Sequence, residues 1–520
     1  MRVLFVTAEA YPLAKTGGLA DVSCALPAAL LRCGIDVRLL LPGYPQAFAR
    51  IKNPRIAAKL DPILGISDAT LVSGILPYTE LPVWLIDSPS LFRRSGGLYQ
   101  NDAGEDWPDN ALRFAFLSHV GAKLAMGRTK VAWNPDIVHA NDWHTGLLPL
   151  LLAKEPLPRP STIFTVHNMA FQGNFPARIF ADIDIPESFF STDAIEYCGE
   201  VSFLKAGLRF GDRVTTVSPT YAEEILTPEH GCGMDDVLRA RRDEFCGILN
   251  GIDEVLWDPA SDPYLPQNYR AGDSTGKHAC KAALQREAGL PQSPETPLIG
   301  YVSRLTHQKM ADTILEALPW IAEHNAQLTI VGEGDKDIER ALLQARERYA
   351  DCLAVTIGYD EPRAHLLQAG SDILLAPARY EPCGLTQLYA LRYGTLPVVR
   401  RTGGLADTIV DVDARTTANR TATGFVFDEP NAISLNLALG RAVDLFGQPL
   451  MWRRLQQQAM AQDYSWETSA AKYLALYRQV SGLPGISAEI IAQSLETKRM
   501  QRALSQDEVA LPSAFARRQE

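Results

Sequence analysis

The sequence contains no long hydrophobic run, no closely paired cysteines and no excess of basic residues. Its densest apolar stretch, residues 146–153, is far shorter than the roughly 20 residues that a membrane-spanning helix needs. The eight cysteines include no CxxC pair and the nine histidines include no HExxH motif, so neither a disulfide framework nor a bound metal is predicted. Lys and Arg number 50 against 61 Asp and Glu, and the net charge of −11 argues against nucleic acid or an anionic membrane as a partner.

Signals for export are also missing. A strand-like segment begins at residue 2, with no basic region before it and no long apolar core or cleavage site after it. Cysteines without a pairing pattern suit a reducing compartment, so we expect a cytoplasmic protein. With 520 residues, of which 46% are hydrophobic and 21% charged, the chain has the composition of a globular protein with more than one domain.

Short apolar strands alternate with helix-like segments along most of the chain. In the first half the predicted strands are residues 2–7, 37–41, 83–86, 137–140, 162–166 and 214–217. In the second half they are residues 298–302, 327–331, 354–357, 372–376, 396–399 and 424–427. Continuous apolar strands separated by helices predict parallel sheets covered on both faces. The expected fold class is therefore α/β, with two facing doubly wound (Rossmann-like) domains and a ligand-binding cleft between them.

The pattern changes near residue 252. Residues 259–297 are rich in Pro, Asp, Ser and Gly, which is typical of a boundary or hinge. We expect a first domain over residues 1–252 and a second one after it. Residues 481–520 differ in composition and form an extension, in which residues 488–502 could be helical.

One short segment occurs twice. Residues 15–21 read KTGGLAD and residues 401–407 read RTGGLAD, and each copy follows a predicted strand and opens a helix. The glycines suit a shared turn, and the aspartate suits an early helical turn. In the first copy, Lys15 beside Gly17 and Gly18 favours an anion-binding loop at a helix N-terminus. Packing alone could explain the second copy.

Two basic residues follow the predicted strand at residues 298–302. Arg304 could bind a diphosphate bidentately there, and Lys309 could act as a point charge. A solvated basic loop is the alternative. The strand-end position and the lack of an acidic residue between the two cations favour the diphosphate clamp.

A second cluster, EPCGLT at residues 381–386, follows the predicted strand at residues 372–376. The Glu381 carboxylate could bond sugar hydroxyls or face a developing positive charge, or it could only complement a helix dipole. Cys383 is interpreted as a packed thiol more readily than as a reactive one. The backbone N–H groups that would point toward a phosphate are those of Gly384, Leu385 and Thr386.

Polar and aromatic residues cluster in the first half as well. The segments HANDWH at residues 139–144 and TVHNMAFQG at residues 165–173 each follow a predicted strand. Such clusters could bind carbohydrate, with polar groups for hydroxyls and flat rings for sugar faces, although a single histidine is more often structural. Tyr359, directly after the strand at residues 354–357, could stack on a base or only cover the core.

The chain also lacks several signatures of catalysis. It has no Walker motif and no GxGxxG motif, so nucleotide hydrolysis and dinucleotide redox chemistry are not predicted. No DxD-type acidic pair directly follows a predicted strand, so lysine and arginine would have to neutralise an anionic leaving group without a metal.

Together these segments resemble the bacterial glycogen synthase and plant starch synthase family. The resemblance extends over residues 3–477, essentially the whole chain before the extension. The similar segments are KTGGLADV (15–22), TVHNMAFQG (165–173), SFLKAGL (202–208), TTVSPTY (215–221), ILNGID (248–253), EPCGLTQL (381–388), YGTLP (393–397) and RRTGGLADT (400–408).

The resemblance implies a glycosyltransferase-B fold and transfer of glucose from ADP-glucose to the non-reducing 4-hydroxyl of an α-1,4-glucan such as glycogen. The configuration at the anomeric carbon would be retained, and neither a metal nor another cofactor would be required. Residues 1–252 would bind the glucan acceptor, residues 253–463 would bind the nucleotide sugar, and a helix over residues 464–480 would return to the first domain. Oligomeric state and chain-length preference stay open.

The resemblance also implies roles for individual residues. The residues expected to hold the diphosphate are Lys15, Arg304 and Lys309, with further contacts from Gly18, Gly384, Leu385 and Thr386. Gly17 and Cys383 are also expected among the substrate-binding residues. Glu381 would bond the donor glucose, His167 would lie beside its 6-hydroxyl, and Tyr359 would lie beside the adenine. The acceptor side would be lined by Asp21, Asp142 and Asn168. The implied mechanism is a same-face displacement in which the leaving phosphate accepts the acceptor's proton.

Two features depart from the family pattern. Met310 stands where the family usually has glycine, so the loop would bring its backbone less close to a phosphate, and the extension continues past the usual end. They suggest an alternative, a glucan-binding regulator or scaffold with weak catalysis. A further alternative keeps the reaction but uses UDP-glucose as the donor.

Overall fold

The computed structural model describes residues 1–482, which separate into two compact units. Residues 483–520, including the segment 488–502, lie outside the described residues. Of the described residues, the first unit comprises Met1–Thr216, Gly231–Gly251 and residues 466–482, and the second comprises Val217–His230 and Ile252–Ser465. The chain therefore passes between the units four times.

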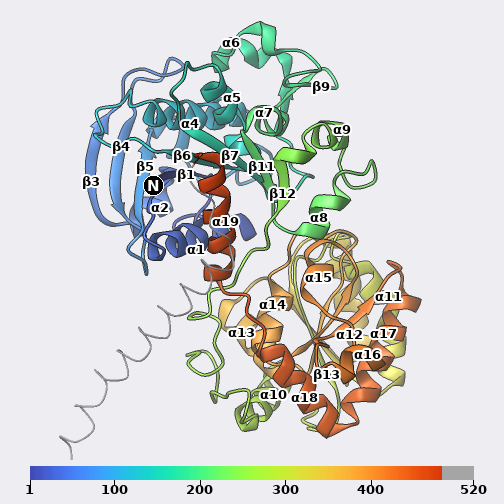
Figure 1. Ribbon diagram of the computed structural model, residues 1–520. Helices are drawn as coiled ribbons and strands as arrows, with labels where there is room; N and C mark the ends of the chain where they lie inside the picture. Colours follow the sequence, from blue (N-terminus) through green and yellow to red (C-terminus); the bar gives the residue numbers. More distant parts are fainter. Residues whose placement is uncertain (483–520) are drawn as a thin grey trace, which may run out of the picture. The chain divides into compact units, whose positions relative to one another are not determined.

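The first unit contains a nine-stranded sheet in the order β12-β11-β7-β6-β1-β2-β5-β4-β3 (Figure 1). The strands are β1 (Arg2–Val6), β2 (Asp36–Pro42), β3 (Lys52–Lys59), β4 (Thr70–Ile75), β5 (Pro82–Asp87), β6 (Ile137–Asn141), β7 (Ser161–Val166), β11 (Arg213–Thr216) and β12 (Phe245–Gly247). All pairs from β12 to β5 are parallel, as the sequence predicted. The strands β1 and β6 at the centre are almost wholly buried.

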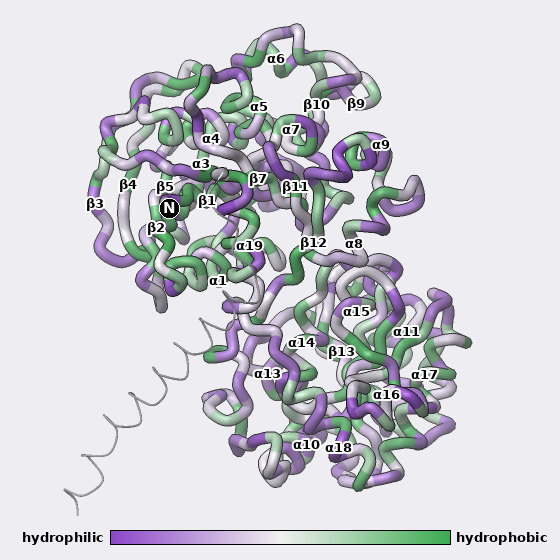
Figure 2. Tube along the Cα trace, in the orientation of Figure 1, coloured by the Kyte–Doolittle hydropathy of each residue, from purple (hydrophilic) through white to green (hydrophobic). Residues whose placement is uncertain are grey.

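The outer edge of this sheet differs from the prediction, because β3 and β4 are antiparallel to their neighbours. Seven of the eight residues of β3 are exposed, the strand contains Pro54, and its pairing with β4 has two register shifts. Figure 2 shows more hydrophilic colour along β3 than along the central strands. Exposed side chains, proline and bulges are typical of an edge strand, and they leave no apolar run that a sequence pattern could reveal.

The first unit also contains α-helices. They are α1 (Gly18–Arg32), α2 (Pro45–Arg50), α3 (Pro89–Phe92), α4 (Asn110–Ala125), α5 (Leu147–Ala153), α6 (Phe180–Ile183), α7 (Phe203–Phe210), α9 (Asp235–Arg239) and α19 (Trp466–Val480). A small sheet of β8 (Asn174–Pro176), β10 (Glu200–Ser202) and β9 (Glu196–Tyr197) precedes α7. Figure 1 shows the last helix, α19, beside α1. Arg32 forms an ion pair with Glu467 at 2.9 Å, and His139 of β6 bonds the Tyr477 hydroxyl at 2.7 Å.

The second unit contains a six-stranded sheet in the order β15-β14-β13-β16-β17-β18, and every pair is parallel. The strands are β13 (Leu298–Val302), β14 (Gln327–Gly332), β15 (Leu353–Ile357), β16 (Ile373–Ala376), β17 (Leu396–Arg400) and β18 (Phe425–Phe427). These six strands confirm the predicted series to within one residue at each end.

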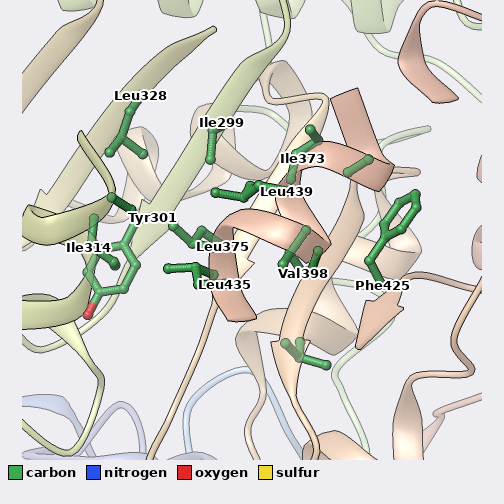
Figure 3. Packing of buried hydrophobic residues seen from close by; sticks show 14 of the residues in the cluster. Ile299, Tyr301, Ile314, Leu328, Ile373, Leu375, Val398, Phe425, Leu435 and Leu439 are labelled. Atoms are coloured by element: carbon green, nitrogen blue, oxygen red, sulfur yellow. The ribbon is translucent and has the colours of Figure 1, made fainter. Parts of the chain in front are cut away.

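The helices of this unit are α8 (Pro219–Glu224), α10 (Thr275–Ala288), α11 (Ala311–Glu323), α12 (Lys336–Arg348), α13 (Glu361–Gly370), α14 (Thr386–Arg392), α15 (Gly403–Thr408), α16 (Ala414–Ala418), α17 (Ala432–Phe446) and α18 (Pro449–Met460). The segment Val217–His230 was expected in the first domain but belongs to this unit, because α8 packs against α15. Figure 3 shows the larger core cluster, in which aliphatic side chains of the strands meet those of α11 and α17.

Parallel pairing brings the carboxyl ends of neighbouring strands to one edge of each sheet. In the first unit, the loops after β1, β6 and β7 therefore leave the sheet at the same edge. In the second unit, the same holds for the loops after β13, β15, β16 and β17. Across the 482 described residues, none of the helices has both the length and the apolar character needed to cross a membrane.

Candidate active site

The loop between β1 and α1 carries the first copy of the repeat. Lys15 Nζ forms an ion pair with Asp21 Oδ1 at 2.7 Å and lies 5.4 Å from the centre of the Tyr11 ring. Burial raises the pKa of Asp21, although Lys15 opposes this shift. The lysine and the aspartate are both partly exposed, so each remains accessible to a ligand.

A buried carboxylate, Glu9, holds this loop in place. Its oxygens accept hydrogen bonds from the Thr16 N–H at 2.6 Å, the Thr16 hydroxyl at 2.5 Å, the Gly17 N–H at 3.2 Å and the Tyr99 hydroxyl at 2.6 Å. The Gly17 N–H is therefore directed to Glu9, and a side chain at Gly18 would meet open space. Nothing in the sequence marks Glu9, because a single acidic residue after a strand has no distinctive spacing.

Asp142 and His167 follow β6 and β7 and are in contact. Asp142 Oδ1 accepts a hydrogen bond from the backbone N–H of His167 at 2.7 Å. Burial raises the pKa of Asp142 to about 7, and burial lowers the pKa of His167 to about 3. His167 is therefore neutral near pH 7. Its Nε2 lies 3.1 Å from Asn141 Oδ1, and since that oxygen only accepts, the assigned tautomer carries its proton on Nε2 and leaves Nδ1 as an acceptor.

Backbone strain occurs at the same place. Asp142 has φ 55° and ψ 177°, a conformation that is normal only for glycine. Asn168, the next predicted residue, forms a turn in which its Oδ1 accepts from the Ala170 N–H at 3.0 Å. Strained non-glycine residues cluster at binding and catalytic sites, so this turn region is a candidate for one.

The aromatic residues of the HANDWH segment pack against each other. The His144 ring stacks on Trp143 at 4.0 Å and on Tyr99 at 4.7 Å. Among the described residues, neither ring nitrogen of His144 has a hydrogen-bond partner, and burial holds its pKa well below the usual range. His144 is thus part of the packed support beneath the polar residues rather than an open surface for a sugar ring.

In the second unit, Arg304 and Lys309 lie in the loop that joins β13 to α11. The Arg304 guanidinium donates to Gln308 Oε1 at 3.0 Å. Lys309 Nζ forms an ion pair with Glu381 Oε2, and both side chains are largely buried. The sequence predicted these three charged residues as site residues but gave no sign that Lys309 and Glu381 pair with each other.

The loop after β16 places Glu381 beside a row of unbonded backbone N–H groups. Within the described part of the chain, no group accepts from the N–H of Gly384, Leu385 or Thr386. Gly384 has φ +71°, which requires glycine or a strained residue, and Cys383 is buried. Three adjacent donors and a lysine are a combination that can bind phosphate oxygens.

The second copy of the repeat supports this loop by packing. Glu224 of α8 accepts from the Thr402 hydroxyl at 3.0 Å and the Gly403 N–H at 2.9 Å. The Gly404 N–H donates to the Glu381 carbonyl at 3.0 Å. A side chain at Gly403 or Gly404 would overlap backbone oxygens of the Glu381 loop. The sequence left open whether packing alone explains the second copy. In the structure the second copy packs closely against the Glu381 loop, which supports the packing explanation.

The structure places the predicted residues in two groups, one in each unit. The group at the carboxyl edge of the first sheet is Lys15, Gly17, Gly18, Asp21, Asp142, His167 and Asn168. The group at the carboxyl edge of the second sheet is Arg304, Lys309, Tyr359, Glu381, Cys383, Gly384, Leu385 and Thr386. Tyr359 is 58% exposed after β15. Residues 1–482 contain no cluster of three or more His, Cys, Asp or Glu side chains arranged to hold a metal ion.

Comparison with known proteins gives consistent matches. Residues 2–240 match the starch synthase catalytic domain family, and residues 286–452 match the family of glycosyl transferases group 1. The glycogen synthase of Burkholderia thailandensis is 51% identical over 91% of this chain and 90% of its own length. That of Paramagnetospirillum magneticum is 49% identical over 93% of this chain and 99% of its own length.

Solved structures give the same result. The catalytic domain of starch synthase IV from Arabidopsis thaliana, bound to ADP and acarbose, is 32% identical and has a TM-score of 0.83. The match covers 92% of this chain and 99% of that domain. Two successive family matches, relatives that are similar over most of the length, and two sheets that are parallel apart from one edge agree with each other. The chain therefore belongs to the glycogen synthase and starch synthase family of glycosyltransferases and has the glycosyltransferase-B fold.

Proposed function

We propose that this protein transfers glucose from ADP-glucose to the non-reducing 4-hydroxyl of an α-1,4-glucan such as glycogen, with retention at the anomeric carbon. It works in the cytoplasm and without a metal ion. The observation that carries the proposal is the group at the edge of the second sheet, where Lys309 pairs with Glu381 and Arg304 lies in the same loop as Lys309. Three N–H groups that follow Glu381 in sequence have no partner among the described residues. Cations and N–H donors suit the diphosphate of a nucleotide sugar, and the carboxylate suits sugar hydroxyls.

The charges of this group stabilise the leaving diphosphate. As the bond between the anomeric carbon and the phosphate oxygen breaks, negative charge grows on that oxygen, and Arg304 and Lys309 stabilise it. By the same chemistry, Lys15 binds a phosphate oxygen. The acceptor 4-hydroxyl forms the new bond to the anomeric carbon from the same face, and its proton passes to the departing phosphate oxygen. This order of events needs no protein nucleophile.

The neutral side chains act on the sugar. Because burial lowers the pKa of His167 to about 3, its imidazole is neutral through the working pH range and can accept a hydrogen bond from the glucose 6-hydroxyl at Nδ1. Glu381, paired with Lys309, accepts hydrogen bonds from other hydroxyls of the donor glucose. Asp21, Asp142 and Asn168 bind the acceptor glucan, and Tyr359 stacks on the adenine.

The test is a donor-comparison assay with glycogen as the acceptor. ADP release and glucan growth are expected with ADP-glucose and should exceed those with UDP-glucose. Lys309→Ala and Glu381→Ala should each lower turnover by about two orders of magnitude or more. Each substitution leaves the charge of the other residue unpaired and removes a contact with the substrate. Lys336→Ala is the matched control, since Lys336 pairs with Glu339 on the surface of the same unit. Faster turnover with UDP-glucose would refute the donor, and glycogen binding without turnover would instead indicate a glucan-binding regulator.

A further inference from the structure

Tyr301 is a tyrosine in the middle of an otherwise apolar strand. It lies in β13, between Gly300 and Val302, and its side chain is 1% exposed. Figure 3 shows its ring within the core cluster and its hydroxyl oxygen at one end. A buried hydroxyl is unfavourable unless it finds a hydrogen-bond partner, so the partners of this one indicate what the residue does.

The hydroxyl of Tyr301 joins the two cations of the candidate site through their backbone. It lies 3.3 Å from the Arg304 carbonyl oxygen and 3.2 Å from the Lys309 carbonyl oxygen. Since a hydroxyl has a single proton to donate, the two carbonyls share it, and both distances exceed the usual 2.7–2.8 Å of an unshared bond. One buried side chain thus ties the loop at the residues that carry both charges.

Neighbouring contacts fix the remainder of this loop. Met310, which ends it, has φ +53° and is completely buried in the same core cluster as Tyr301. On the outer side, the Leu305 N–H donates to the Glu333 carbonyl at 2.9 Å, and the Arg379 N–H donates to the Gln308 carbonyl at 2.9 Å. Tyr301 supplies the corresponding inner attachment at both carbonyls, and the Thr306 N–H also donates to the Arg304 carbonyl, at 3.0 Å.

We propose that Tyr301 is a positioning residue that sets the separation of Arg304 and Lys309 for the diphosphate of the donor. The proposal rests on the proposed function, since it assumes that these cations bind the donor. Long cationic side chains lose conformational freedom when they bind a phosphate. A backbone already held at the right spacing reduces that loss and places the charges where the leaving group develops.

The first test compares two conservative variants. Tyr301→Phe keeps the ring and removes the shared hydroxyl. Tyr269→Phe is the matched control, because the buried Tyr269 hydroxyl also lies between two carbonyls, those of Ala369 and Tyr393, in another cluster of the same unit. We expect kcat/KM for ADP-glucose to fall about tenfold in Tyr301→Phe and less than about twofold in Tyr269→Phe, with KM for glycogen unchanged in both. Melting temperatures verify that both variants fold.

The second test asks whether Tyr301 acts through the cations. The affinity for ADP is measured by calorimetry for Tyr301→Phe alone and in a background that carries Arg304→Ala and Lys309→Ala. We expect binding about fivefold weaker in the first case and changed by less than about twofold in the second, since the charges that Tyr301 positions are then absent. The proposal would be overturned if Tyr301→Phe weakened ADP binding by the same factor in both backgrounds. It would also be overturned if Tyr269→Phe lowered kcat/KM as much as Tyr301→Phe does. If the unmodified protein binds ADP but does not turn over ADP-glucose, the proposed function fails while the binding cycle still decides the role of Tyr301.

Discussion

At the scale of single residues, both copies of the repeated TGGLAD segment are held by a glutamate. In each copy the carboxylate accepts from the threonine hydroxyl and from the N–H of the first glycine. The pairs are Glu9 with Thr16 and Gly17, and Glu224 with Thr402 and Gly403. The two glutamates come from unrelated positions in the sequence, one before the repeat and one on α8. The repeat therefore forms a turn whose threonine hydroxyl and glycine N–H donate to a carboxylate. A glutamate outside the repeat provides that carboxylate in each copy.

Met310 has a strained backbone and a buried side chain. Mutation can separate the contributions of these two features to the free energy of unfolding. The φ of +53° at this position disfavours a methionine, whereas glycine adopts it freely, and the Met310 side chain is fully buried in the core. We expect Met310→Gly and Met310→Ala both to lower the free energy of unfolding of the second unit, because both leave a cavity. Met310→Gly should nevertheless be more stable than Met310→Ala by about 1 kcal/mol, although glycine is the smaller residue. Urea unfolding of both variants measures the difference, and a more stable alanine variant would show that strain is not stored here.

Asp142 should make stability depend on pH. Burial raises its pKa to about 7 in the folded protein, against about 3.9 in an unfolded chain. Below about pH 4 both states hold the proton. As the pH rises from 4 to 7, the unfolded chain releases the proton while the folded protein keeps it, so the contribution of Asp142 to stability is lost over this window.

The substitution Asp142→Asn removes this titration, and asparagine tolerates a positive φ better than most residues. The free energy of unfolding of Asp142→Asn, relative to that of the unmodified protein, should therefore increase by about 2–4 kcal/mol between pH 4.5 and pH 7.5. Urea unfolding across that range provides the measurement. A difference that is constant with pH would mean that Asp142 titrates normally.

At the scale of elements, the two aspartates that end the repeats do different things. Asp407 accepts from the Ser218 hydroxyl, from the Thr220 N–H at 3.0 Å and from the Thr220 hydroxyl at 2.6 Å, and so joins α15 to α8. Among residues 1–482, the side-chain partner of Asp21 is Lys15, in a partly exposed ion pair. Asp407→Ala should lower the free energy of unfolding by about 2 kcal/mol, because it leaves partly buried donors unsatisfied. Asp21→Ala should lower it by less than about 1 kcal/mol. Thermal unfolding compares the two, and equal losses would refute this difference.

The central strands could be predicted because they are short, apolar and buried. Strands β1 and β13 are short apolar runs, each followed by a helix-like segment, and their neighbours follow the same pattern. Strand β3 could not be predicted, because Lys52, Pro54 and Arg55 interrupt any alternation, and its pairing depends on β4. The segment Val217–His230 likewise joins the second unit because α8 packs against α15, nearly 200 positions away in the sequence.

The candidate site could be predicted where charge, glycine spacing or a cluster of polar and aromatic residues at a strand end marks it. Lys15, Arg304 and Glu381 stand at strand ends in recognisable segments. Glu9 and Tyr301 could not be found in this way. Each acts through hydrogen bonds to the backbone of a loop, and any residue type can supply that backbone. Such supporting residues become visible only when the fold has brought them into contact.

At the scale of the whole molecule, the first unit is closed by a helix from the far end of the chain. Tyr473 and Tyr477 of α19 are fully buried, and the Tyr477 hydroxyl bonds His139 in the centre of the sheet. A chain ending at Ser465 should lose more than about 5 kcal/mol of stability in the first unit, since it loses several large buried side chains, whereas the second unit keeps its core. Hydrogen exchange should show protection only in Val217–His230 and Ile252–Ser465. A chain ending at Gly482 is the control, and protection of the first unit in the shorter chain would contradict this expectation.

The position of α19 also has a consequence for synthesis on the ribosome. The first unit has all its strands by Gly251, but its last helix follows only after the 214 residues of Ile252–Ser465. At about 5–20 residues per second, that interval lasts roughly 10–40 s. During this time the surface that α19 will cover, including His139 and α1, is exposed in the nascent chain. Slow translation therefore lengthens the time during which the first unit can aggregate through this exposed surface. Conditions that delay synthesis of Ile252–Ser465 should lower the yield of native protein.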